Sequence, residues 1–125
     1  MNMNAVQFVR VTAICRGDGK SWPEYTVTLL CGLDENDNIA DGQWFGYLRN
    51  VAALNPFILE GEHEEFIYGG IPKCMEKSNI KKKKILPREL FTVFSPYENG
   101  EIEETMYEIN TVLPYNTISE PEQSS

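Results

Sequence analysis

The alternation of residues 25–33 constrains the fold more than any other feature of this sequence. Every odd position of that stretch is apolar, and two of the even positions are threonine. Successive side chains of a strand point to opposite faces of a sheet, so the pattern predicts a half-buried β-strand. Residues 5–16 are rich in β-forming side chains, and residues 17–20 have the composition of a turn. We therefore expect the two segments to pair as an antiparallel hairpin.

A helix is expected after the second strand. Asp41 can cap its first turn, and apolar side chains recur at helical spacing as far as about Leu54. Asn55-Pro56 would end it, because proline disfavours helical backbone in the residue before it. Gly46 would destabilise such a helix by about 1 kcal/mol relative to alanine, which counts against this prediction.

Further strands are expected in the second half of the chain. Short segments of strand composition cover residues 66–68, 85–86 and 90–94. Residues 101–113 fit either a helix face or a strand with a bulge near Met106, and the Asn99-Gly100 pair before them favours a β-hairpin. The sequence thus predicts a mainly β (α+β) fold, a small antiparallel barrel or curled sheet of five to six strands with one helix.

Length and local composition predict one domain. A chain of 125 residues has room for a single core. Apolar periodicity ends after Pro114, and residues 119–125 have the composition of a disordered segment. We expect a single globular β-rich domain over residues 1–114 and a disordered acidic tail over residues 115–125.

The expected setting is cytoplasmic. No apolar run approaches the roughly 20 residues that cross a bilayer, so no membrane partner is expected. The first residues lack the basic start and the apolar core of a secretion signal. Cys15, Cys31 and Cys74 are odd in number and stand in apolar contexts, which is typical of buried free thiols rather than of a disulfide framework.

Charge is divided unevenly along the chain. Residues 73–88 carry seven cations and one anion, a net charge of +6, whereas the rest of the chain carries −14 within a total of −8. Segregated charge steers encounters and selects partners. The distribution therefore favours a function that depends on charged surfaces.

Four adjacent lysines are the sharpest single feature: Lys81, Lys82, Lys83 and Lys84. Their ammonium groups can contact phosphates or an acidic protein surface, although an extended chain points only two of the four the same way. Lysines also protect sheet edges from pairing with other chains. Edge protection, protein binding and nucleic-acid binding all stay open as roles of the lysines. If the protein binds nucleic acid, bases could stack on some of the aromatic residues Trp22, Tyr25, Trp44, Phe45 and Tyr47. Core packing is the better explanation for Tyr25 and Trp44.

Two acidic clusters offer the opposite kind of surface. One surrounds His63, and the other includes Glu101, Glu103 and Glu104. Such a surface can occupy the basic groove of a nucleic-acid enzyme or a toxin, and electrostatic complementarity would give it fast association. The second cluster and the four lysines are the predicted binding residues.

No catalytic constellation and no metal motif stands out. The acidic loop of residues 34–41 lacks the glycine and glutamate of an EF-hand, and no nucleophile that could pair with His63 sits in a recognisable turn such as Gly-x-Ser-x-Gly. The sequence therefore predicts a non-enzymatic binding or accessory protein without a cofactor or metal, such as an inhibitor or immunity-type partner of a basic protein. Two alternatives are a small nucleic-acid-binding barrel that uses the lysines, and a small enzyme or ligand-binding domain with a pocket near His63. The oligomeric state is left open.

Overall fold

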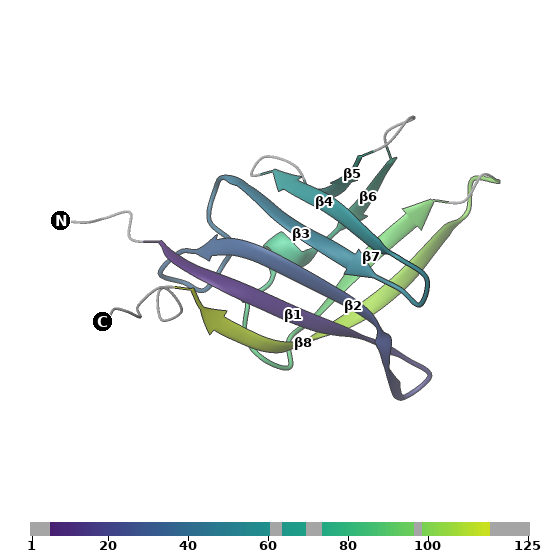
Figure 1. Ribbon diagram of the computed structural model, residues 1–125, viewed down its shortest axis with the longest axis horizontal. Coiled ribbons are helices and arrows are strands. Elements are labelled where there is room, and N and C mark those ends of the chain that lie inside the picture. The colour runs from purple at the N-terminus through teal and green to yellow at the C-terminus, as the bar shows by residue number, and fades with distance from the viewer. Residues whose placement is uncertain (1–5, 61–63, 70–73, 97–98, 116–125) are drawn as a thin grey trace.

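The chain folds into a closed barrel whose eight antiparallel strands follow one another in sequence order (Figure 1). The computed structural model describes residues 6–60, 64–69, 74–96 and 99–115. The strands are β1 (Gln7–Gly17), β2 (Lys20–Leu33), β3 (Gln43–Arg49), β4 (Leu54–Glu60), β5 (Glu65–Tyr68), β6 (Cys74–Ser78), β7 (Leu90–Pro96) and β8 (Ile102–Pro114). A 3-10 helix, η1 (Ile80–Lys82), lies between β6 and β7. Because β8 pairs with β1, every described strand has a neighbour on both sides.

The predicted hairpin of the first two strands is confirmed. β1 and β2 pair antiparallel, beginning with Gln7 opposite Leu33. Asp18 and Gly19, at the turn, have φ values of 53° and 74°. A type I′ turn requires positive φ at both central residues, and its twist matches that of the flanking strands.

The helix predicted between Asp41 and Leu54 is wrong, because this stretch forms β3 and the first residue of β4. Trp44 and Leu48 stand four residues apart, and that spacing places two side chains on one face of a helix or on one face of a strand. The choice depends on backbone pairing, since β3 fills the free side of β2 and then pairs with β4.

Gly46 explains why β3 can approach β2 so closely. A Cβ atom at this position would lie 2.3 Å from the carbonyl oxygen of Thr28 and 3.1 Å from the Cα of Leu29. The missing side chain, a weakness in a helix, is therefore a requirement of this strand.

The later strands agree with the sequence in part. β5 and β7 confirm the strands predicted at residues 66–68 and 90–94, but residues 85–86 form no strand. β8 confirms the strand favoured for residues 101–113, and its register shifts beyond Ile109 rather than near Met106. β3, β4 and β6 were not predicted as strands, so the barrel has eight strands instead of five to six. The described ranges contain no α-helix.

One end of the barrel is closed by residues 79–89, which we call the plug segment. Its Ile80 and Ile85 side chains are 0% and 1% exposed and belong to the core. The plug is bonded to β7, because the Asn79 N–H donates to the Thr92 carbonyl (3.3 Å) and the Thr92 N–H donates to Asn79 Oδ1 (2.8 Å). The Ile85 N–H donates to a carbonyl of the β2–β3 connection at 2.7 Å.

A single apolar core lies inside the barrel. Its members come from the strands, the β2–β3 connection and the plug segment: Val9, Val11, Ala13, Val27, Leu29, Cys31, Leu33, Ile39, Phe57, Leu59, Phe66, Ile80, Ile85, Phe91, Val93, Tyr107 and Ile109. Toward the opposite end, polar side chains take over the inward positions. The predicted tail over residues 115–125 lies outside the described residues except for Tyr115, and it stays a prediction.

Candidate functional site

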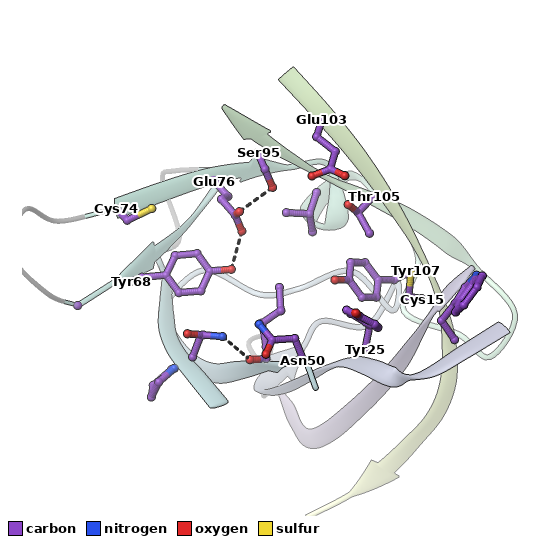
Figure 2. A pocket seen from close by; sticks show the side chains of 16 residues that line it. Cys15, Tyr25, Asn50, Tyr68, Cys74, Glu76, Ser95, Glu103, Thr105 and Tyr107 are labelled. Carbon is purple, nitrogen blue, oxygen red and sulfur yellow. Dashed lines mark hydrogen bonds between the residues drawn. The ribbon is translucent and has the colours of Figure 1, made fainter. Parts of the chain in front are cut away.

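A cavity of about 880 Å³ occupies the end of the barrel opposite the plug segment. All eight strands contribute residues to its wall. The lining residues are Cys15, Trp22, Tyr25, Leu48, Asn50, Asn55, Pro56, Tyr68, Gly69, Cys74, Glu76, Val93, Ser95, Glu103, Thr105 and Tyr107 (Figure 2). Pockets for small molecules span roughly 300–1,000 Å³, so the volume is sufficient for one ligand.

Strand alternation places the polar side chains inside. In β8 the odd positions Glu103, Thr105 and Tyr107 line the cavity, whereas Glu104 and Met106 are exposed on the outer face. The same alternation in β7 turns Val93 and Ser95 inward. Residues that are adjacent in the sequence therefore face different environments.

Glu76 is the centre of a hydrogen-bond network in the cavity wall. The Tyr68 hydroxyl donates to Glu76 Oε1 at 2.7 Å, and the Ser95 hydroxyl donates to Glu76 Oε2 at 2.6 Å (Figure 2). Each carboxylate oxygen has two lone-pair sites, so each keeps one for a further donor. The network fixes the carboxylate without exhausting its capacity to accept.

The same network joins three strands. Backbone pairing between β6 and β7 covers only Lys77 opposite Phe94 and Ser78 opposite Val93. On the cavity side of these pairs, the Glu76 side chain bridges β6 to β7 and also to β5. The hydrogen bonds of Glu76 thus have a structural role beside any role in binding.

The side chain of Tyr107 is buried, and its hydroxyl has no hydrogen bond to any residue that the structure describes. The residue is 3% exposed, and its ring stacks on Phe91 with centroids 5.6 Å apart. Figure 2 shows its hydroxyl directed into the cavity, toward that of Tyr68. Because this hydroxyl faces the cavity and can both donate and accept, it is available as a contact for a bound molecule.

The hydroxyls and the half-buried thiol of the cavity stay protonated near neutral pH. Burial raises the pKa of Tyr68, and the bonded Glu76 raises it further. Burial is also the main cause that raises the pKa of Tyr107, with nearby Cys15 and Glu76 adding to it. Burial raises the pKa of the Cys15 thiol, and a protonated thiol is a poor nucleophile.

The three cysteines differ in exposure. Cys31 is buried in the core, as predicted, and burial raises the pKa of its thiol to about 12. Cys15 is half-buried, and Cys74 is exposed at the cavity, so the prediction of a buried thiol is wrong for Cys74. All three are free thiols.

The formal charge of the cavity wall is negative. Glu76 and Glu103 are its two carboxylates, and its sixteen residues include no lysine, arginine or histidine. Four aromatic rings, those of Trp22, Tyr25, Tyr68 and Tyr107, add negative π faces to the same wall. A bound molecule would therefore meet carboxylates, hydroxyls and aromatic rings together.

The four lysines predicted as a binding patch lie at the closed end, far from this cavity along the strands. They belong to η1 and the loop that follows, not to a strand, so the edge-protection interpretation does not apply. Each ammonium group contacts a group of its own chain: Lys81 the Glu60 carbonyl (3.3 Å), Lys82 the Glu64 carboxylate (3.7 Å), Lys83 the Glu89 carboxylate (3.9 Å) and Lys84 the Asn36 carbonyl (2.7 Å). Their binding to an acidic protein or to nucleic acid stays a prediction.

The structure separates the predicted acidic residues. Glu103 lines the cavity, Glu104 lies on the outer face of the same strand, and Glu101 lies in the turn before β8. His63 lies outside the described residues. The neighbouring ends of β4 and β5, Glu60 and Glu65, are not part of the cavity wall.

Sequence reasoning missed the central residues of the cavity, Tyr68, Glu76, Ser95 and Tyr107. The available signal was the presence of polar side chains at inward positions, as in β8, where apolar residues are the rule. Tyr25 was predicted in the core and instead lines the cavity with 37% exposure. Trp44 packs against the core, as predicted, and its Nε1 donates to the Ala40 carbonyl at 2.8 Å.

No protein-family model, no curated protein and no solved structure matches this chain. The class is therefore defined by geometry: a closed eight-stranded antiparallel barrel with a cavity at one end. An eight-stranded barrel has an interior that side chains fill or that holds one small ligand. The described ranges contain no helix long and apolar enough to cross a membrane and no group of three or more potential metal-ligating side chains. A cytoplasmic setting stays a prediction.

Proposed function

We propose that this protein binds one small organic molecule in the cavity of the barrel and does so without catalysis. The observation that carries the proposal is the Tyr107 hydroxyl: the residue is 3% exposed, and its hydroxyl is directed into about 880 Å³ of space and has no hydrogen-bond partner among the described residues. A ligand group can form the hydrogen bond that this hydroxyl does not make within the described part of the protein. The proposal keeps the non-enzymatic role predicted from the sequence and puts the binding site inside the barrel.

The cavity wall suits recognition of an amphipathic molecule. Leu48 and Val93 supply apolar surface, while Glu76 and Thr105 supply hydrogen-bonding groups. Burial raises the pKa of the Cys15 thiol, which lowers its reactivity as a nucleophile. Typical ligand sites combine apolar walls with a few polar groups that fix orientation, as this wall does.

The test uses a fluorescent neutral probe, 1-aminoanthracene, and two variants of neighbouring residues. Thr105→Phe fills the cavity, and Met106→Phe adds a similar ring on the outer face of the same strand. We expect saturable 1:1 binding that weakens at least tenfold in Thr105→Phe and stays unchanged in Met106→Phe. Urea unfolding shows whether each variant is folded, and Thr105→Leu replaces Thr105→Phe if the larger side chain prevents folding. Equal binding by the cavity and surface variants would show that the probe lies elsewhere.

A further inference from the structure

The charge of the cavity wall limits the class of ligand that the cavity can bind. This inference rests on the proposed function. Its charged residues are Glu76 and Glu103, and none of the sixteen lining residues is basic. Figure 2 shows the Glu103 carboxylate directed toward the space in front of Glu76 and Tyr107. Among the described lining residues, an anionic ligand would meet two carboxylates and no cation.

The hydrogen-bonding groups of the wall also favour a ligand that donates hydrogen bonds over an anionic one. Tyr68 and Ser95 already donate to Glu76, one to each oxygen, so what Glu76 still offers is acceptor sites. A ligand group with several N–H donors satisfies such sites, and a charged donor gives the stronger hydrogen bonds. Tyr107 adds a neutral hydroxyl that can accept from the same group.

Aromatic side chains contribute to the same cavity wall as this acceptor site. Trp22 and Tyr25 lie in β2 at the entrance, 39% and 37% exposed, and Tyr68 and Tyr107 lie deeper. Aromatic faces attract cations, most strongly when water is excluded. Carboxylates, an unpartnered hydroxyl and aromatic faces together form the kind of wall that recognises organic ammonium groups.

We infer that the ligand of this cavity is a small organic cation, an amine with an apolar or aromatic body. Its ammonium group is held by Glu76 and Tyr107, with Glu103 contributing at the rim. Its apolar body lies against Trp22 and Tyr25.

Three probes of matched shape test the sign of the charge: tryptamine, which is cationic, tryptophol, which is neutral, and indole-3-propionate, which is anionic. Titration calorimetry at low ionic strength is expected to show tryptamine binding at least tenfold more tightly than tryptophol, with indole-3-propionate weakest. Equal or tighter binding of tryptophol or indole-3-propionate would overturn the cation inference and leave the proposed function intact. Failure of all three probes and of 1-aminoanthracene would overturn the proposed function itself.

Charge-neutralising variants locate the selectivity. Glu76→Gln keeps the shape of the side chain and a carbonyl for the Tyr68 hydroxyl, so the strands stay joined while the charge is lost. Tryptamine affinity should fall at least tenfold in Glu76→Gln and by a smaller factor in Glu103→Gln, whereas tryptophol affinity changes less than threefold. Glu104→Gln is the matched control, because it removes the same charge from the outer face of β8. If the three variants lose tryptamine affinity equally, the selectivity is a long-range effect of net charge and the assignment to this cavity is wrong.

Discussion

Replacement of Ile80 by alanine tests whether the plug segment is part of the barrel core. Ile80 is 0% exposed, and it follows Asn79, which the two hydrogen bonds with Thr92 join to β7. If the segment closes the barrel, removal of this side chain leaves a void next to packed residues. Leu86 in the same segment is 43% exposed and provides a matched control.

The magnitude follows from the burial of the side chain. Ile80→Ala removes three carbon groups at about 0.8 kcal/mol each, and the void that remains adds to this loss, so about 3 kcal/mol is expected. A domain of this length has a free energy of unfolding of about 5–15 kcal/mol, so the variant should still fold. Leu86→Ala should change stability by less than about 0.5 kcal/mol.

Urea unfolding followed by tryptophan fluorescence measures both variants. With a denaturant slope of about 1–3 kcal/mol per molar, the Ile80→Ala midpoint should fall by roughly 1–3 M, while that of Leu86→Ala should move little. Similar small shifts in the two variants would refute the view that Ile80 is held in the core. The cavity would then lack a closed floor at that end of the barrel.

Three further predictions concern the strands, the buried acids and the lysines. Gly46→Ala should destabilise the barrel by about 1–3 kcal/mol, because its Cβ would lie 2.3 Å from a β2 carbonyl oxygen, and unchanged urea unfolding would contradict that close approach. Burial raises the pKa of Cys31 to about 12 from 9.0, and also raises those of Tyr68 and Tyr107, so the unfolded chain loses these protons at a lower pH than the folded one. These three groups should therefore lower the stability as the pH rises from 9 toward 12, by up to about 1.4 kcal/mol per pH unit for each group, and a flat profile of urea midpoints over that range would contradict this. Replacement of all four lysines, residues 81–84, by glutamine should change stability by no more than about 1 kcal/mol per exposed ion pair. If a protein partner binds these lysines, the variant should fail to capture it in a low-salt pull-down. Equal capture by wild type and variant would exclude that role.

The local sequence pattern predicted strands correctly where it fitted the period of a strand and not that of a helix. Alternation over residues 25–33 and the Asp18-Gly19 turn predicted the first hairpin correctly, because both signals depend only on nearby residues. Trp44 and Leu48 satisfied the helix period and the strand period together, so the pattern could not decide between them. The ladders of β3 with its two neighbours decided it, and those hydrogen bonds come from distant parts of the chain.

The candidate site was less accessible from sequence than the fold. Of the predicted binding residues, only Glu103 lies in the cavity, since Glu101, Glu104 and the lysines are distributed to the turn, the outer face and the plug. Tyr68, Glu76 and Ser95 belong to three different strands, two of them separated by the plug segment. Nothing in their local sequence links them.

By itself, the sequence determined the β-rich character of the chain, its first hairpin and its uneven charge, because composition, alternation and turn residues act over a few positions. Only the tertiary structure decided that eight strands close into a barrel and which polar side chains face inward together. Closure pairs the first strand with the last, and such pairing depends on long-range register rather than on local preference. The cavity, with its carboxylate network and its unpartnered hydroxyl, exists because that closure brings the ends of all eight strands to one place.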